Sequence, residues 1–466
     1  MRKSNVYIYG NGNECRKVIH RLKQLEDLVN IKGIVVSKKE QEFGIENVKI
    51  LELSQIEEYD FIIIAVYKWR EIYEILKTKD VDDSKIILSA ELYRNNLKFP
   101  DEFNNRTINF ETIDNDYYHI YEAYDKEYMK EAVLHYPPRS ITIGVTSACK
   151  NKCLFCAYHG EEFKDSSNVY GLPFSLSIYK FKRIVDMAYE GHVPHIHVCG
   201  TGEPFANPNI LEMLDYVIFK YGSVSIQTEF WPDIFKKYNY LQALCDRENY
   251  IDYITTDLFS ADEVIHNDIK RGTQLTELLE ALRYISKNSS IEFHINIILT
   301  KKNYKDIYKI MELLTQNEIK NYVINIVNLF TYDGSDFTSK DNTYTSKDND
   351  IMNELDIALK YAKDHNIQIS IPIPEDKENK RCDHFWTKFQ TWPVKGCEED
   401  RYDENMVPMA CNAVVNGGLN TLGYILDYDT IMDAWNNEIL IDIRNNMLEG
   451  RYPSDKCKEC YLYSKD

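Results

Sequence analysis

The amino-terminal part of the chain alternates between short apolar runs and amphipathic stretches. The apolar run NVYIY at 5–9 stops at the Gly-Asn-Gly turn of 10–12 and passes into ECRKVIHRLKQL, whose apolar positions repeat at helical spacing. Two further apolar runs follow, IKGIVV at 31–36 and YDFIIIAVY at 59–67, with helical or turn segments between them. This pattern is typical of a small parallel α/β unit, so we expect residues 1–98 to form a Rossmann-like domain.

The glycine turn matches the dinucleotide-binding fingerprint only in part. Gly10 and Gly12 occupy its first two places, but Cys15 replaces the third glycine, and the next strand ends at Ser37 without an acidic ribose ligand. We therefore do not expect NAD binding. A phosphate at the helix amino terminus and a purely structural or docking role remain as alternatives.

The middle of the chain repeats the strand and helix pattern over a longer stretch. Residues 99–137 are expected to form a polar connector with a helix inside. Six apolar runs then alternate with amphipathic segments, which predicts an α/β fold with a partial (β/α)6 barrel of the TIM type over 138–375. Within it we expect a long polar loop at 331–350, a helix at 351–365 and a strand at 367–371. The six runs are ITIGVT from Ile141, HIHVCG at 195–200, VSIQT at 224–228, YITTDL from Tyr253, FHINIILT at 293–300 and YVINIVN at 322–328.

Composition limits the classes of protein to consider. The chain has 466 residues, enough for about three domains of roughly 150 residues each. It has 74 acidic against 55 basic residues, and the net charge of -19 repels nucleic acid and anionic membrane surfaces. No apolar run approaches the ~18 residues of a membrane helix, and the amino terminus lacks the apolar region of a signal peptide. We expect a cytoplasmic protein with no nucleic acid and no membrane partner.

The 11 cysteines need an explanation. Cytosolic thiols stay reduced, so a disulfide framework is not expected and metal ligation is the first role to consider. Cys15, Cys199 and Cys245 have no partner at ligand spacing, and we interpret them as small buried side chains.

Three other cysteines are spaced closely enough to bind one metal centre. Cys149, Cys153 and Cys156 lie in the loop VTSACKNKCLFCAYHG, directly after an expected strand. Three thiolates on four irons leave one iron open, where a substrate or cosubstrate can bind. By spacing alone, a zinc site completed by His159 would satisfy the same cysteines.

This loop resembles the signature of the radical S-adenosylmethionine superfamily, including the aromatic Phe155 before the last cysteine. The segment GTGEP at 200–204, one strand and one helix further on, resembles the superfamily's glycine–glycine–glutamate–proline motif. The resemblance implies a catalytic [4Fe-4S] cluster, S-adenosyl-L-methionine at its open iron, and a 5′-deoxyadenosyl radical that removes a hydrogen atom from the substrate. Glycine in the motif permits close approach of the backbone to a ligand, and the carboxylate can accept from an ammonium group.

Weaker resemblances follow later strands. Asp257 lies near the usual ribose contact, and Arg271 lies where a basic residue often pairs with the methionine carboxylate. Thr228 closes an earlier strand, although Glu229 stands beside it where the family often has asparagine. Asp257 and Arg271 would equally suit a solvated helix surface, so both interpretations stay open. The cofactor-binding residues that the resemblance implies are Phe155, Gly200, Thr201, Gly202, Glu203, Pro204, Thr228, Asp257 and Arg271.

The carboxyl-terminal part, residues 376–466, is expected to be a separate cysteine-rich module. Its two early cysteines and late Cys-x2-Cys pair resemble the SPASM and twitch extensions of radical enzymes. Four thiolates fill every position of one auxiliary [4Fe-4S] cluster, and a structural zinc ribbon would use the same four. Cys382 competes for the place of the first ligand, and we favour Cys397. The four ligands implied are Cys397, Cys411, Cys457 and Cys460.

Three functions are compatible with these expectations. The first is an enzyme that oxidises or otherwise modifies a small molecule such as a sugar or nucleotide-sugar, with the auxiliary cluster as electron acceptor. The second is a maturase that makes a thioether, a carbon–carbon link or an epimerised residue in a ribosomally made peptide. The third is a non-catalytic, zinc-stabilised docking protein. Both enzymes would need an external one-electron reductant of the flavodoxin or ferredoxin type.

Overall fold

The structure is a computed structural model that describes most, though not all, of the chain. The described residues are 2–38, 48–66, 69–93, 98–108, 131–156, 159–160, 175–329, 338, 342, 344, 348–371, 384–393, 406–409 and 424–452. Most of the expected loop at 331–350 and the centre of the expected connector lie outside them. The cysteines of the carboxyl-terminal module, Cys382, Cys397, Cys411, Cys457 and Cys460, also lie outside the described residues.

The first sheet has five parallel strands in the order β3-β2-β1-β4-β5. Side chains of β1 alternate between two buried apolar clusters: Tyr7 and Tyr9 belong to one, Val6 and Ile8 to the other. Helix α1 contributes to the cluster of Ile8 and helix α2 to that of Tyr7, so both faces are covered. The Rossmann-like fold is confirmed, with two three-residue strands beyond the three expected. The elements are β1 (Ser4–Tyr9), α1 (Asn13–Lys23), β2 (Val29–Val36), β3 (Ile50–Glu52), β4 (Phe61–Ile64), α2 (Trp69–Lys77) and β5 (Ile86–Leu88).

The glycine turn after β1 is explained by packing. Gly10 has a φ of +124°, and a Cβ there would lie 2.6 Å from the carbonyl oxygen of Ala65, just after β4. Gly12 has no atom within 4 Å of the corresponding position. The first glycine of the partial fingerprint thus permits the close approach of two neighbouring strand ends.

The second sheet has nine strands in the order β12-β11-β10-β9-β8-β7-β6-β13-β14. The pairs from β12 through β13 are parallel, and β14 alone pairs antiparallel. The six expected strands are β6 to β11, which confirms the core of the partial barrel, and β12 corresponds to the strand expected at 367–371. The strands are β6 (Ser140–Gly144), β7 (Ile196–Cys199), β8 (Val224–Gln227), β9 (Ile251–Asp257), β10 (Phe293–Leu299), β11 (Tyr322–Asn328), β12 (Gln368–Ser370), β13 (Lys388–Pro393) and β14 (Met406–Met409).

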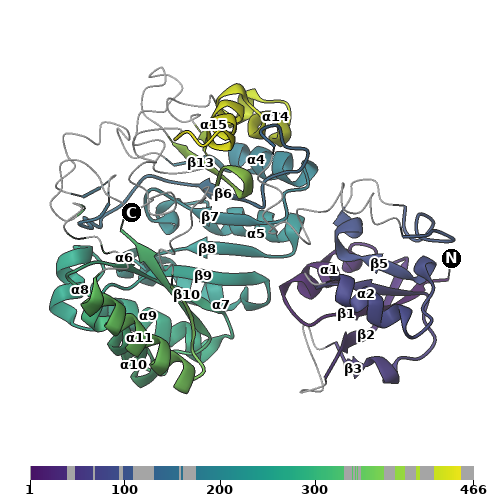
Figure 1. The fold of residues 1–466 in the computed structure, drawn as a ribbon, viewed down its shortest axis with the longest axis horizontal. Helices are drawn as coiled ribbons and strands as arrows, with labels where there is room; N and C mark the ends of the chain where they lie inside the picture. Colours follow the sequence, from purple (N-terminus) through teal and green to yellow (C-terminus); the bar gives the residue numbers. More distant parts are fainter. Residues whose placement is uncertain are drawn as a thin grey trace.

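Helices cover the outer face of this sheet (Figure 1). Neighbouring helices touch in pairs, α4 with α5, α7 with α9 and α10 with α11. Helix α11 is the helix expected at 351–365. Among the described helices, none is long and apolar enough to cross a membrane. Their bounds are α4 (Ile178–Glu190), α5 (Ile210–Tyr221), α6 (Pro232–Tyr238), α7 (Tyr240–Cys245), α8 (Glu263–Lys270), α9 (Leu275–Asn288), α10 (Ile307–Gln316), α11 (Asn349–Asp364), α12 (His384–Thr387), α14 (Ile431–Trp435) and α15 (Glu438–Leu448).

The two faces of the barrel sheet differ in polarity. Along β10, the side chains of Phe293, Ile295 and Ile297 are buried in the apolar core beneath the helices. The intervening side chain of Asn296 points to the other face, where it donates to Asp257 Oδ1 at 3.2 Å. Alternation along a strand therefore produces an apolar outer face and a polar inner face. Polar residues at the carboxyl ends of these strands are gathered on the inner face.

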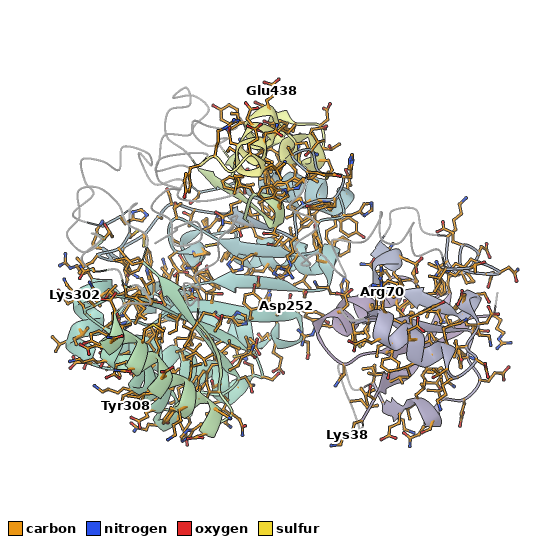
Figure 2. The ribbon with its side chains drawn as sticks, viewed as in Figure 1. Lys38, Arg70, Asp252, Lys302, Tyr308 and Glu438 are labelled. Carbon is orange, nitrogen blue, oxygen red and sulfur yellow. The ribbon has the colours of Figure 1, made fainter. Side chains whose placement is uncertain are left out.

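Helix α1 also contacts the barrel. Lys17 Nζ donates to the carbonyl oxygen of Pro194 at 3.3 Å, and Arg16 Nη1 lies 3.8 Å from Asp252 Oδ1. Figure 2 shows Asp252 at the junction of the barrel with the first sheet. Pro194 precedes β7 and Asp252 lies near the start of β9, so the contact forms at the amino ends of the barrel strands.

Arg444 joins α15 to the start of the barrel. Its fully buried guanidinium donates to the carbonyl oxygens of Phe385 at 2.8 Å, Ala132 at 3.0 Å and Trp435 at 2.8 Å. Burial lowers its pKa to about 9. These bonds satisfy carbonyl groups from three separate segments and so hold them together.

Candidate active site

The cysteine loop, residues 145–156, is fixed to the end of helix α8 by its backbone. Lys152 N donates to the carbonyl oxygen of Arg271 at 3.0 Å, and Leu154 N donates to that of Ile269 at 2.9 Å. Both acceptors are carbonyl groups at a helix carboxyl terminus, which lack partners within the helix. The loop therefore has a defined position relative to α8.

The three thiols of this loop influence one another. Cys149, Cys153 and Cys156 are partly exposed and free of disulfides. Burial raises the pKa of Cys149 and of Cys153, and the charge of Cys156 raises both further. Bound metal converts such thiols to thiolates, and three neighbouring cysteines suit a cluster with three protein ligands. Within the described part of the chain, no group of three His, Cys, Asp or Glu side chains is already arranged around a metal-ion position.

The GTGEP segment packs directly on the cysteine loop. Gly202 N donates to the carbonyl oxygen of Thr146 at 3.1 Å, and Glu203 N donates to that of Ala148 at 2.9 Å. A Cβ on Gly202 would lie 2.2 Å from the Ala148 oxygen, and one on Gly200 would lie 2.7 Å from the Thr146 oxygen. The backbone approach that these glycines permit is thus to the cysteine loop. From the sequence we expected these glycines to let the backbone approach a bound ligand, whereas in the structure they let it approach the cysteine loop.

Glu203 is held by three hydrogen bonds in a buried position. The donors are the Thr228 hydroxyl at 2.7 Å, Glu229 N at 2.7 Å and Phe205 N at 3.1 Å, the last in a short 3-10 turn that Pro204 begins. Burial raises the pKa of Glu203 to about 7, although the hydrogen bonds oppose this shift. A cationic group placed beside this carboxyl would favour its ionised form.

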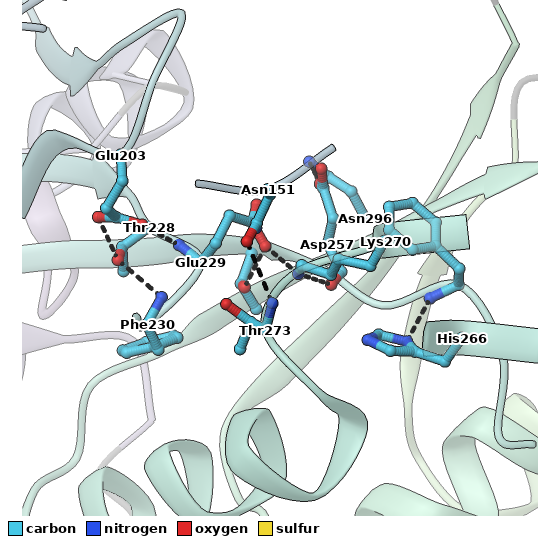
Figure 3. A network of polar contacts seen from close by, with 12 residues as sticks. Asn151, Glu203, Thr228, Glu229, Phe230, Asp257, His266, Lys270, Thr273 and Asn296 are labelled. Carbon is cyan, nitrogen blue, oxygen red and sulfur yellow. Dashed lines mark hydrogen bonds and ion pairs between the residues drawn. The ribbon is translucent and has the colours of Figure 1, made fainter. Parts of the chain in front are cut away.

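A second buried group lies next to Glu203 (Figure 3). Lys270 Nζ contacts Glu229 Oε2 and donates to the carbonyl oxygen of Asp257 at 2.9 Å. Burial raises the pKa of Glu229 to about 8, and it also raises that of Asp257, while the charge of Lys270 works against both shifts. Asn296 binds the Asp257 carboxyl from the neighbouring strand. Residues from β9, β10, the turn after β8 and the end of α8 therefore meet in one polar network.

The basic residue of this network is Lys270, whereas the sequence drew attention to its neighbour. Arg271 ends α8 with a φ of +48°, and its Nε donates to the carbonyl oxygen of Asp268 at 3.1 Å. The part predicted for Arg271 in cofactor binding thus stays a prediction. Lys270 shares the buried face of α8 with His266 and Ile269. Ile269 and Lys270 follow His266 by three and four residues, the spacing of one helix face. This spacing is the sequence signal that could have predicted a buried Lys270.

Aromatic and small polar side chains lie near the cysteines. The ring centres of Phe155 and Phe259 are 4.9 Å apart, in an apolar cluster that includes Leu154. The buried Thr201 hydroxyl has no hydrogen-bond partner among the described residues. Burial lowers the pKa of His159, the residue considered as a zinc ligand, and so favours its neutral form.

The cysteines to which no chemistry was assigned are all buried, as expected. Cys15 is 0%, Cys199 5% and Cys245 6% exposed. Cys199 differs from the other two because its thiol lies on the polar inner face and donates to Gln227 Oε1 at 3.1 Å. Burial raises its pKa to about 12, so it stays a thiol.

Comparison with known proteins agrees with this geometry. The model of the Radical SAM superfamily matches residues 143–314. The antilisterial bacteriocin subtilosin biosynthesis protein AlbA of Bacillus subtilis is 33% identical over 91 residues, which cover 20% of this chain and 18% of AlbA. The chain thus matches less than a fifth of that relative's length.

Solved structures extend the likeness of fold over most of the chain. The crystal structure of Streptococcus suis SuiB bound to S-adenosylmethionine has a TM-score of 0.55 at 16% identity and covers 85% of this chain and 82% of that chain. The structure of SuiB bound to the precursor peptide SuiA has a TM-score of 0.54 at 18% identity with the same coverage. The family match includes the cysteine loop, the GTGEP segment and the Lys270 network. Residues 143–314, which contain these three features, therefore carry the match to the Radical SAM superfamily.

Proposed function

We propose that this protein is a radical S-adenosylmethionine enzyme that modifies a peptide. In this proposal Cys149, Cys153 and Cys156 hold a [4Fe-4S] cluster, and its open iron binds S-adenosylmethionine. The observation that carries it is the attachment of the three-cysteine loop both to the GTGEP segment and to the end of α8. This double attachment fits a loop that must keep three ligands in place around an open metal position.

The residues around the loop would divide the work of binding. The chemistry supplied by cluster and cofactor is reductive cleavage of the sulfonium, which gives a 5′-deoxyadenosyl radical for hydrogen abstraction. Glu203, which Thr228 and the Glu229 amide orient, would accept from the cofactor's ammonium group. Asp257, which Asn296 orients, would accept from a ribose hydroxyl.

A peptide substrate has better support than a sugar. SuiB shares the fold of this chain and was solved with a precursor peptide, and AlbA is named for the biosynthesis of a bacteriocin. The sugar hypothesis was motivated by the four filled ligand positions of the expected auxiliary cluster, which suit an electron acceptor, and nothing in these comparisons adds to it. We therefore place peptide modification ahead of sugar oxidation.

The remaining parts of the proposal concern segments around the core. We assign residues 1–98 to a Rossmann-like domain, 99–137 to a connector, 138–375 to the radical core and 376–466 to an auxiliary module. In the last of these, one [4Fe-4S] cluster would use Cys397, Cys411, Cys457 and Cys460, with Cys382 as the alternative first ligand. Thiolate ligands favour a reducing compartment, so we propose a cytoplasmic enzyme served by a flavodoxin- or ferredoxin-type reductant.

Anaerobic reconstitution tests the radical chemistry. The loaded protein should contain about eight irons with matching sulfide, as two four-iron clusters require. With S-adenosylmethionine and dithionite it should form 5′-deoxyadenosine, followed by mass spectrometry. A Cys149/Cys153/Cys156 triple alanine variant should lose the product while keeping the auxiliary irons. Stoichiometric zinc without sulfide, and no deoxyadenosine, would instead favour the docking protein.

The substrate class needs a separate experiment. A short peptide encoded beside this gene should change mass when incubated anaerobically with the loaded protein, cofactor and reductant, and should not change with the triple variant. A panel of nucleotide-sugars serves as the comparison. Turnover of a nucleotide-sugar with every peptide unchanged would reverse the order of the two hypotheses.

A further inference from the structure

Lys270 is a cation enclosed within the candidate active site. Its side chain is 1% exposed, and its ammonium contacts Glu229, donates to the Asp257 carbonyl oxygen at 2.9 Å and lies 5.8 Å from the centre of the Phe259 ring. Removal of an ammonium from water costs several kcal/mol, and one carboxylate contact offsets this cost only in part. The position therefore favours further negative charge nearby.

After the carboxyls of Glu229 and Asp257, the cysteine loop is the next source of negative charge beside Lys270. Leu154 N donates to the carbonyl oxygen of Ile269 at 2.9 Å, so the residue after Cys153 is bonded to the residue before Lys270. This bond fixes the ammonium in place relative to the thiols.

We propose that Lys270 sets the reduction potential of the catalytic cluster, an inference that rests on the function proposed above. Reduction transfers one electron from the flavodoxin- or ferredoxin-type reductant to a centre already surrounded by three thiolates and the carboxylate of Glu229. A fixed positive charge in a site with little water stabilises the reduced form more than the oxidised form. The net charge around a cluster is one of the factors that set its potential. Lys270 thereby brings the cluster closer to the potential of its reductant.

Glu229 carries the charge opposite to that of Lys270, so its removal provides a second test of the proposal. Glu229 contacts the Lys270 ammonium, and its amide donates to Glu203, whose own amide donates to the carbonyl oxygen of Ala148 beside Cys149. Removal of Lys270 and removal of Glu229 should therefore shift the potential in opposite directions. Replacement of both should leave it near the wild-type value, because the two charges disappear together.

The test is a potentiometric titration of the reconstituted protein in the absence of S-adenosylmethionine. The reduced cluster is monitored at each potential by electron paramagnetic resonance. It is run at pH 9, above the pKa of about 8 that Glu229 has beside Lys270. Loss of Lys270 raises that pKa further, so the double variant is also compared with Glu229→Gln, where the carboxyl is absent from both. The catalytic cluster is identified by the change in its signal when cofactor is added at the end. Lys270→Met should shift its potential to more negative values and Glu229→Gln to more positive ones. Lys270→Arg should retain the wild-type value, and the double variant should return close to it.

Lys220→Met is the matched control. This lysine pairs with Asp186 at 2.7 Å between the outer helices α4 and α5, away from the cysteine loop. Its replacement removes a paired ammonium of the same kind, and the cluster potential should not move. A shift as large as that of Lys270→Met would mean that the potential responds to net charge rather than to position, and would overturn the proposal.

Other outcomes are equally decisive. Equal potentials in wild type, Lys270→Met and Glu229→Gln overturn the proposal. An unchanged potential with tenfold weaker S-adenosylmethionine binding in Lys270→Met also overturns it, and assigns the lysine to the cofactor. Should Lys270→Met fail to load, the double variant is compared with Glu229→Gln, because these two differ only in the lysine. A more negative potential in the double variant supports the proposal, and equal potentials overturn it. Wild-type protein that takes up no iron and sulfide overturns the proposed function, whereas loaded protein with an unmoved potential overturns only this inference.

Discussion

At the scale of single residues, Thr228 satisfies two buried partners at once. Its hydroxyl donates to Glu203 at 2.7 Å and accepts from Phe230 N at 3.1 Å, and the side chain is 0% exposed. Valine has nearly the same shape without the hydroxyl, so Thr228→Val removes one of the two donors to Glu203 Oε1, which keeps Phe205 N, and takes away the acceptor of the buried Phe230 amide. We expect the free energy of unfolding of the metal-free protein to fall by about 2 kcal/mol, measured by urea denaturation.

The control for this loss is an exposed hydroxyl. Thr78 donates to the carbonyl oxygen of Ile75 in an exposed position, where water can replace it. Thr78→Val should change the unfolding free energy by less than about 0.5 kcal/mol. Equal losses in the two variants would show that the effect comes from valine itself rather than from the buried network.

Glu203 also makes stability depend on pH. Its pKa is raised from 4.5 to about 7 by burial, so the folded protein binds more protons than the unfolded chain between these values. This contribution to stability is complete below pH 4.5 and is lost as the pH rises through 7. The loss amounts to at most about 1.4 kcal/mol for each pH unit in the window.

Measurement of this dependence requires a difference, because buried histidines act in the opposite sense. Burial lowers the pKa of His195 to about 4 and that of His266 to about 3, and their neutral forms stabilise the fold as the pH rises toward 6.5. Urea midpoints of wild type and Glu203→Gln at pH 5, 6, 7 and 8 isolate the carboxyl. The advantage of wild type should decline with rising pH, and a constant difference would contradict the assignment.

At the scale of elements, the site depends on two loops that pack backbone to backbone. A Cβ on Gly202 would meet the Ala148 carbonyl oxygen at 2.2 Å, and neither backbone can move without loss of the hydrogen bonds that join the loops. Gly202→Ala should destabilise the metal-free protein by about 2 kcal/mol. It should also lower the iron bound after reconstitution by more than half.

Gly12→Ala provides the matched control for this substitution. Gly12 also lies in a glycine turn, but no atom stands within 4 Å of its Cβ position. Iron uptake should equal that of wild type, and thermal stability should stay within the error of the measurement. Equal iron loss in both alanine variants would argue against the steric explanation.

The elements differ in how far the sequence predicted them. Strands β6 to β11 were expected because each has a run of apolar and β-branched residues long enough to recognise, as in FHINIILT around β10. Strands β3 and β5, of three residues each, are too short to stand out. Asp257 was placed correctly at a strand end, whereas Lys270 was overlooked because a buried lysine contradicts the usual exposure of its type. The network that encloses it depends on strand register, which the sequence does not specify alone.

At the scale of the whole molecule, β9 connects two regions of different character. Asp257 at its carboxyl end belongs to the candidate active site, and Asp252 near its amino end faces helix α1 of the first sheet. Asp252 is buried and accepts from the Ser223 hydroxyl at 2.8 Å. The pKa of His195, which lies 3.6 Å from Asp252, is lowered to about 4, so this histidine is neutral near pH 7. Arg16 is then a charged partner of Asp252 among the described residues. The attachment of the first sheet thus depends on a charge pair at the end opposite the cysteines.

Arg16→Met should therefore loosen the first sheet without altering radical formation. The substitution leaves Asp252 as a buried charge without a cation, which costs about 3 kcal/mol. We expect faster hydrogen exchange in α1 and at the start of β9, measured by mass spectrometry. The formation of 5′-deoxyadenosine should be unchanged. Arg16→Met combined with Asp252→Asn should recover most of the protection, because no unpaired charge remains. Lys32→Met, on an exposed position of β2, should have no effect, and an equal effect there would exclude the charge pair as the cause.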